Sequence, residues 1–196
     1  LQLVTINDGQ QATLAGTGAG VNLASNTHWE NTLIGYNAGN AITGGDYNTA
    51  FGAYALKLTT TGSNNTGLGR RALHDNTTGN ENTALGHSTL KNNTTGHSNV
   101  AIGHSSMEDN TTGYDNTALG NDALKNNETG VYNVSIGRGS MYNTTSGSNN
   151  TAVGANTLVD NTVGDGNSAL GLNSLYRNTS GSYNVAFGWN ALHSNT

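Results

Sequence analysis

The sequence predicts an all-β fold, a parallel β-solenoid of ten coils that are each seventeen residues long. Asn recurs at every seventeenth residue from Asn31 to Asn184, with no insertion between the ten copies. Each of these Asn residues is followed at a fixed distance by a large apolar residue and, in nearly every copy, by a second one five residues later. Gly, Asn, Thr and Ser fill most other positions, and this excludes a helical repeat because few strong helix formers remain. Such a fixed period is typical of stacked coils.

The repeat is numbered from its Asn as position 1, and its clearest copy runs from Asn82 to Ser98. Positions 1 to 4 alternate as a short strand does, so Thr or Val at position 2 shares a face with the large residue at position 4. Position 4 holds one predicted core residue in each copy, namely Ile34, Phe51, Leu68, Leu85, Ile102, Leu119, Ile136, Val153, Leu170 and Phe187.

Two glycines in each copy predict the bends of the coil. The Gly at position 5 permits a bend directly after the strand. The Gly at position 15 is expected to supply a positive φ for a second tight turn. Each repeat is therefore predicted to form one coil of strand, turn, strand and turn, and position 15 is occupied by Gly45, Gly62, Gly79, Gly96, Gly113, Gly130, Gly147, Gly164 and Gly181.

Position 9 carries the second predicted row of core residues, and Gly39 in the first copy is its one exception. One row is expected inside the coil and the other against neighbouring chains, with Leu119 of position 4 in a dry interior. Three chains around a common axis would leave no free lateral surface, so a homotrimer is predicted. The residues of this row are Leu56, Leu73, Leu90, Met107, Leu124, Met141, Leu158, Leu175 and Leu192.

The Asn at position 1 is predicted to form an internal ladder of side-chain amides along the rod. Identical side chains at the same position of stacked coils lie one above the other, and amide groups then hydrogen-bond along the axis. The predicted ladder residues are Asn48, Asn65, Asn82, Asn99, Asn116, Asn133, Asn150, Asn167 and Asn184.

Residues 1–30 match the repeat poorly and are interpreted as an N-terminal cap or a connection to a preceding module, whereas residues 31–196 form the array. Residues 1–6 predict a strand and Asn7 to Gly9 a turn. The glycine-rich stretch from Gly16 to Gly20 is interpreted as a flexible join.

The composition argues against several classes of function. Lys and Arg total seven in a chain of net charge −5, and their one cluster is Arg70-Arg71, so nucleic acid is not expected as a partner. The absence of Cys excludes a thiolate metal site. No apolar run is long enough to span a bilayer. Because the histidines have no Ser or carboxylate at a recurrent offset, no enzyme activity and no cofactor are expected.

Two weaker motifs have structural interpretations that we prefer. His87 and His104 share position 6 of consecutive coils and could bind a metal, but a pair of exposed surface residues is the simpler interpretation, so no metal is expected. Several Asn residues of position 12 fit the N-glycosylation pattern, although Asn also suits a tight turn there. They are Asn76, Asn93, Asn110, Asn127 and Asn178.

Two binding functions remain as alternatives to a purely structural role. Exposed aromatic residues at variable positions could stack on sugars, and Tyr142, Tyr176 and Trp189 are the candidate glycan contacts. A row of Thr at position 13 has a spacing of the kind that ice-binding solenoids use, although it lies beside a turn. The chemistry of the variable positions drifts from copy to copy, and this favours a spacer.

The segment from Asn99 to Ser106, with the sequence NVAIGHSS, resembles the strand motif of the YadA-type head repeat of trimeric autotransporter adhesins. The whole array from Asn31 onward is similar to repeats of phage tail-fibre proteins. The resemblance implies a left-handed parallel β-roll, a homotrimer, and an extracellular location on a virion tail fibre or a bacterial surface. It also implies a role in attachment to a host or surface, with this segment serving as a rigid spacer.

Overall fold

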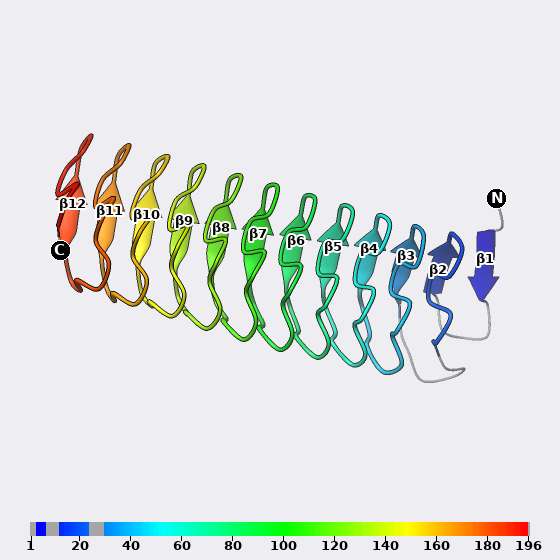
Figure 1. The fold of residues 1–196 in the computed structure, drawn as a ribbon. Coiled ribbons are helices and arrows are strands. Elements are labelled where there is room, and N and C mark those ends of the chain that lie inside the picture. Colours follow the sequence, from blue (N-terminus) through cyan, green and yellow to red (C-terminus); the bar gives the residue numbers. More distant parts are fainter. Residues whose placement is uncertain (1–2, 7–11, 24–29, 196) are drawn as a thin grey trace.

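The computed structural model describes residues 3–6, 12–23 and 30–195, and the described part contains twelve strands and no helix. The strands form one sheet in the order of the chain, drawn out as a long rod of stacked coils (Figure 1). Two four-residue strands come first, and ten three-residue strands follow at positions 2 to 4 of the successive copies. They are β1 (Leu3–Ile6), β2 (Ala12–Ala15), β3 (Thr32–Ile34), β4 (Thr49–Phe51), β5 (Thr66–Leu68), β6 (Thr83–Leu85), β7 (Val100–Ile102), β8 (Thr117–Leu119), β9 (Val134–Ile136), β10 (Thr151–Val153), β11 (Ser168–Leu170) and β12 (Val185–Phe187).

From β2 to β12 every neighbouring pair of strands is parallel, which makes the fold a parallel β-solenoid as predicted. Within the repeat array each strand residue lies opposite the residue at the same position of the next copy. Thr83, for example, pairs with Val100, and Leu85 pairs with Ile102. The fixed period therefore produces an exact stack of like residues, and each position of the repeat becomes a row along the rod.

Each coil contains one strand, so the prediction of a second strand is wrong. Positions 6 to 11 form turns, yet their backbone amides still bond between coils. The amide of Leu90 donates to the carbonyl of Ser106 in the next coil (3.0 Å), and that of Ser88 donates to Arg70 in the preceding coil (3.0 Å). A regular strand is interrupted because positions 7 and 9 adopt left-handed backbone conformations, as in Ser88 (φ 55) and Leu90 (φ 49).

The glycine at position 15 has a different role from the predicted one. No described Gly of this position has φ in the left-handed region, and the residue that does lies at position 17, as in Ser98 (φ 56). Gly96 instead permits a close approach of coils: a Cβ there would lie 2.3 Å from Asn93 Oδ1 and 2.4 Å from the carbonyl oxygen of Gly113. The glycine at position 5 is needed both for its positive φ and for the close approach of the next coil. Gly103 has φ +132, and a Cβ added there would lie 2.4 Å from the carbonyl oxygen of Gly120.

The interior of the rod is lined by positions 3, 8 and 9. Leu and Met of position 9 are fully buried from Leu56 to Leu175, whereas Leu192 in the last coil is 48% exposed. The small residues at position 3, such as Ala101 and Ala118, face these large side chains from the strand and are also fully buried. The structure thus assigns the inner apolar row to position 9.

The row at position 4 lies on the outside of the coil, so the expected placement of Leu119 in a dry interior is wrong for the single chain. Because side chains alternate along a strand, a buried position 3 turns positions 2 and 4 outward. Leu119 is 43% exposed and Phe51 is 57% exposed. The same outward row contains Ile34, Leu68, Leu85, Ile102, Ile136, Val153, Leu170 and Phe187, each half-buried or exposed.

Two ladders of Asn side chains run along the rod. At position 1, Asn99 donates its backbone amide (3.1 Å) and its Nδ2 (3.1 Å) to Asn82 Oδ1, as the predicted ladder requires. A second ladder at position 12 was not predicted, and in it Asn110 Nδ2 donates to Asn93 Oδ1 (2.7 Å). Asn99 and Asn110 both donate Nδ2 to the carbonyl of Gly113, at 2.9 and 3.0 Å. The ladders therefore meet at the position 15 glycine of each coil.

The coil geometry begins before Asn31, because β2 pairs in parallel with β3 and Gly16 to Gly20 form the turns of an additional coil rather than a flexible join. The predicted N-terminal strand is present as β1, which pairs antiparallel with β2. The predicted turn at Asn7 to Gly9 lies outside the described residues. The end of the rod that carries β1 is thus closed by a strand of opposite direction.

In the first full copy the large interior residue is at position 3 and the small one is at position 9, the reverse of the other copies. Leu33 occupies position 3, where other copies have a small residue, and it is fully buried. A Cβ on Gly39 at position 9 would lie 2.7 Å from Leu33 Cδ1 and 2.9 Å from Ile42 Cδ1. The exception at Gly39 therefore conserves the volume of the core, since the large side chain comes from the strand instead.

Candidate functional site

The outward strand face, formed by positions 2 and 4, contains a continuous row of large apolar residues at position 4 beside a row of Thr, Val and Ser at position 2. Positions 2 and 4 flank the buried position 3 on each three-residue strand, so their side chains repeat along the whole sheet. Exposure reaches 62% at Val185 and 67% at Phe187 near the C-terminal end and is 42% at Leu85 in the middle. Exposed apolar surface of this extent is typical of a site of interaction with another macromolecule.

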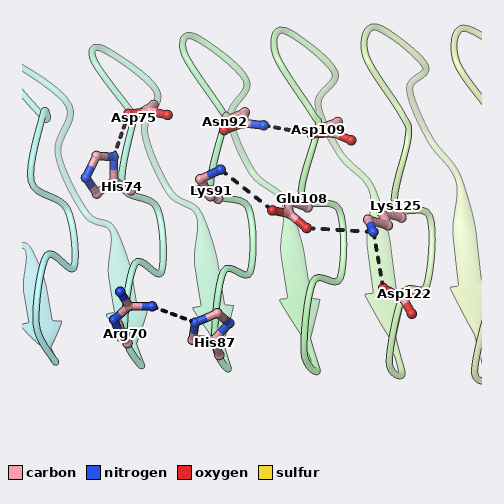
Figure 2. A network of polar contacts seen from close by, with 10 residues as sticks. All are labelled: Arg70, His74, Asp75, His87, Lys91, Asn92, Glu108, Asp109, Asp122 and Lys125. Atoms are coloured by element: carbon pink, nitrogen blue, oxygen red, sulfur yellow. Dashed lines mark hydrogen bonds and ion pairs between the residues drawn. The ribbon is translucent and has the colours of Figure 1, made fainter.

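One edge of this face is basic. It is formed by positions 6 and 7, which directly follow the strand, and contains Arg70, Arg71 and Arg138, which we call the basic edge. Arg70 and His87 lie on the loops that follow the strand arrowheads in Figure 2, with Arg70 Nη1 3.0 Å from His87 Nε2. None of the three arginines has an ion pair among the contacts of the described residues.

His87 and His104, the candidate metal pair, lie on this edge and stack on each other. Their ring centroids are 5.2 Å apart and the rings are nearly parallel, with an interplanar angle of 10°. Stacked rings direct their nitrogens alongside each other rather than toward a common point. Within the part of the chain that the structure describes, no group of three His, Cys, Asp or Glu side chains could hold a metal ion.

The opposite edge of the strand face is acidic. It is formed by positions 16 and 17, which precede the Asn that begins each strand, and contains Asp46, Glu81, Asp115 and Asp165, which we call the acidic edge. Positions 16 and 17 contain no Lys or Arg in any copy. Asp115, Glu81 and Asp165 are exposed. The carboxylates and the arginines flank different strands, so the two edges differ in charge along the rod as a whole rather than within a single strand.

Aromatic rings lie between the carboxylates of the acidic edge. The rings of His97 and Tyr114 stack with centroids 4.8 Å apart, and Tyr114 meets Tyr132 edge to face at 5.5 Å. A side-chain hydrogen bond with Tyr114 raises the pKa of Tyr132, and the Asp115 carboxylate adds to this shift. Tyr132 is 52% exposed, so this edge presents both charge and aromatic surface.

The return limb, positions 8 to 12, has an outer surface on which several charged groups are paired within the chain (Figure 2). All three lysines of the protein are at position 10. Glu108 lies between two of them, 3.7 Å from Lys91 Nζ and 3.9 Å from Lys125 Nζ. Lys125 Nζ is also 3.7 Å from Asp122, and Asn92 donates to Asp109 Oδ1 at 2.7 Å.

His74 and Asp75 form the closest histidine–carboxylate pair of the described residues, with Nδ1 2.5 Å from Oδ1. Such a pair orients a catalytic histidine in many hydrolases, but the chemistry also needs a nucleophile on the other ring nitrogen. No hydrogen bond joins His74 to a hydroxyl group in the described chain, and its ring neighbour is Tyr54 at 6.2 Å. The pair belongs instead to the polar surface of the return limb.

The three candidate glycan contacts lie in two different rows of the rod. Tyr142 lies under Lys125 Nζ, which is 5.5 Å from its ring centroid, and Tyr176 stacks on His193 at 5.2 Å. Both belong to position 10, whereas Trp189 belongs to position 6 of the last coil and is 74% exposed. Tyr142 and Tyr176 therefore share one side of the rod two coils apart, and Trp189 lies on another side.

The Asn residues of the glycosylation pattern at position 12 are interior residues. Asn76, Asn93, Asn110, Asn127 and Asn178 are fully buried, and the Nδ2 that would carry a sugar donates to a glycine carbonyl in each of them. The folded rod therefore has no accessible amide at these five sites.

The Thr hydroxyls of position 13 are used to join coils. Thr94 Oγ1 donates to the carbonyl of Thr111 at 2.9 Å, and Thr77 Oγ1 donates to Thr94 at 2.9 Å. The same bond is formed by Thr60, Thr111, Thr145 and Thr162. A row whose hydroxyl protons bond to the backbone has fewer donors for ordering water, which weakens the ice-binding alternative.

No family model, no curated protein and no solved structure matches this chain. Among the described residues there is also no helix of the length and apolarity needed to cross a membrane.

Proposed function

We propose that the chain is a structural segment of a fibre or spike, in which three copies lie parallel around a common axis and act as a rigid spacer. The setting is a phage tail fibre or a cell-surface adhesin, outside the cell, with a role in attachment to a host or surface. The left-handed winding implied by the resemblance to the YadA-type head is part of this proposal. The observation that carries it is the row of large apolar residues that continues at position 4 on the outer strand face of every coil of a long, uniform rod.

Rigidity is supported by the bonding between coils. Successive coils are joined by parallel strand pairing, by backbone bonds from the turns, and by buried Asn ladders. With a rise of ~4.8 Å per coil, ten coils span roughly 50 Å. A rod in which each coil contacts only its neighbours extends without changing its cross-section, which suits a spacer.

Self-association is supported by the shape of the apolar face. Leu119 is 43% exposed, and the other large residues of position 4 continue this apolar row along the sheet, with Val100, Val134 and Val185 adding to it at position 2. A partner that covers this face must present apolar groups at the spacing of the coils over the full length of the rod. A second copy of the same chain has the same spacing because it has the same repeat. Three copies around one axis would cover all three strand faces.

The mass of the native species tests the proposal directly. Sedimentation velocity and native mass spectrometry of the full chain are expected to show a trimer. A folded, stable monomer at micromolar concentration contradicts the proposal, because it would show that the apolar face tolerates water without a partner.

A further inference from the structure

Outside the strand face itself, charge is distributed unevenly around the coil. The lysines and Arg177 lie on the return limb, where Lys91 and Lys125 have carboxylates of their own chain within 4 Å, whereas Lys57 and Arg177 are in none of the described ion pairs. Arg70, Arg71 and Arg138 lie at the basic edge and have no carboxylate partner among the described ion pairs. Asp122 is the one acidic residue at positions 6 and 7, and Lys125 of its own coil already pairs with it.

The acidic edge shows the converse pattern. Glu81 accepts a hydrogen bond from Ser98 Oγ (3.2 Å), and Asp165 Oδ1 accepts one from the backbone amide of Ser148 (2.7 Å). Neither these carboxylates nor Asp115 has a cation among the described ion pairs. Arg70, Arg71 and Arg138 on one edge and Glu81, Asp115 and Asp165 on the other therefore have no oppositely charged partner among the described ion pairs.

We infer that the two edges of the strand face recognise each other between copies of this chain, so that the basic edge of one copy pairs with the acidic edge of the next. This inference rests on the proposed self-association and adds its contacts and direction. Consider parallel copies arranged around an axis that runs along the rods, with their strand faces turned toward it. The strands of all copies then run in the same sense around the axis, so the end of a strand in one copy lies beside the start of a strand in the next copy. The arginines of one copy then lie on the side that carries the carboxylates of the next copy.

An antiparallel arrangement gives the opposite result. Two rods that face each other across a two-fold axis running along the strands keep their strand direction, so basic edges meet basic edges and acidic edges meet acidic ones. Like charges placed together oppose association. The charge pattern thus selects parallel copies and rejects antiparallel ones, whereas the apolar rows alone would accept either.

The charges also correspond in height along the rod. Arg70 and Arg71 follow β5 and Glu81 precedes β6, while Arg138 follows β9 and Asp115 precedes β8. Each pair is separated by one coil, or ~4.8 Å, which the long arginine side chain can span. Tyr132 precedes the same strand that Arg138 follows, so the exposed ring of one copy faces the guanidinium of the next.

Charge reversal in the full chain tests this inference. One variant reverses the basic edge (Arg70→Glu, Arg71→Glu, Arg138→Glu) and another reverses the acidic edge (Glu81→Lys, Asp115→Lys, Asp165→Lys). Each is expected to weaken assembly at least about tenfold in dissociation constant, measured by sedimentation at low ionic strength. The chain with all six substitutions is expected to assemble again, because its edges are complementary once more.

A matched control reverses three cations on the return limb, with Lys57→Glu, Lys91→Glu and Lys125→Glu. It changes the net charge as much as the basic-edge variant and is expected to leave assembly within about twofold of the native chain. Circular dichroism establishes that each variant is folded.

The outcomes separate the inference from the proposed function. If the native chain assembles and the edge reversals act no more strongly than the control, or if the chain with six substitutions stays dissociated, the inference is overturned while self-association stands. A monomeric native chain overturns both.

Discussion

On the return limb Glu108, Lys91 and Lys125 form ion pairs within the chain, whereas the strand face and its two edges, here called the strand limb, expose a row of large apolar residues. No described ion pair joins the arginines of the basic edge to a carboxylate. Glu108 lies between Lys91 and Lys125 in neighbouring coils, and the amides and hydroxyls of positions 12 and 13 bond along the rod. The strand limb presents Val100 and Leu119 to solvent, between two edges of opposite charge.

The difference indicates which side of the coil finds its interaction partners within a single chain and which side needs another molecule. A solvent-facing surface is stable when its polar groups are satisfied locally, as on the return limb. The strand face exposes side chains that gain most from leaving water. The comparison therefore predicts that substitutions inside the coil affect folding, substitutions on the strand face affect association, and substitutions on the return limb affect either only slightly.

The largest effect is expected for Leu124→Asp at position 9. Leu124 is fully buried, so the carboxylate has no water and no partner, and the free energy of unfolding should fall by more than about 4 kcal/mol. Chemical denaturation followed by circular dichroism measures the change. Leu124→Met is the control, because Met107 and Met141 occupy this position, and it should cost less than about 1.5 kcal/mol.

A different effect is expected for Leu119→Asp, five residues earlier in the same coil. Its side chain is 43% exposed in the single chain, so the coil should stay folded, while the dissociation constant of the assembly should rise at least about tenfold. Sedimentation and circular dichroism on the same sample separate the two effects. Leu119→Ile should behave as the native chain does. Equal loss of folding for Leu119→Asp and Leu124→Asp would contradict the assignment of inside and outside.

Much of the fold follows from the sequence because the repeat is exact. The period places like residues above one another, which is enough to predict the parallel strands of positions 2 to 4 and the ladder of Asn82 and Asn99. The two apolar rows themselves are predictable, but the assignment of position 4 to the dry interior is wrong, because the Leu124 row is the buried one and Leu119 is 43% exposed. The exception at Gly39 is explained only together with Leu33, since the two residues exchange sizes across the core.

Other features could not be predicted from residue types. The left-handed conformations at Leu90, Arg71 and Tyr132 occur at residues that rarely adopt them, so a rule based on glycine assigned the positive φ to position 15 instead. The outward direction of position 4 did have a signal, namely the small residue at position 3. A small residue on a strand leaves room for a large one opposite, and this indicates which strand face is inside.

A moderate gain in stability is expected for Thr144→Asn, at a break in the position 12 ladder. Asn127 Oδ1 is buried without a hydrogen-bond partner, because Thr144 in the next coil cannot reach it, and Thr144 Oγ1 is also unpaired. An Asn at 144 can donate to Asn127 Oδ1 and accept from Asn161, which joins the two halves of the ladder. The free energy of unfolding should rise by about 1 kcal/mol.

The control for the ladder is Thr144→Val, which removes the unpaired hydroxyl but cannot donate to Asn127 Oδ1. Thermal and urea unfolding should place it below Thr144→Asn in stability. If Thr144→Val equals or exceeds Thr144→Asn, the benefit comes from removing a buried hydroxyl, and continuity of the amide ladder contributes nothing.

The smallest effect is expected for Glu108→Gln on the return limb. The substitution removes the carboxylate shared by Lys91 and Lys125 but keeps the shape of the side chain. Partly exposed ion pairs contribute little because water and salt screen them, so the free energy of unfolding should fall by less than about 1 kcal/mol. The loss should shrink further at ~1 M salt, where the Debye length is about 3 Å. Unfolding curves at low and high salt measure both quantities, with Glu128→Gln at position 13, outside this network, as the control. A larger loss that persists in high salt would show that the charges of the return limb help to hold the coils in register. The return limb would then differ from the strand face in the type of interaction that stabilises it, and not only in having its partners within one chain.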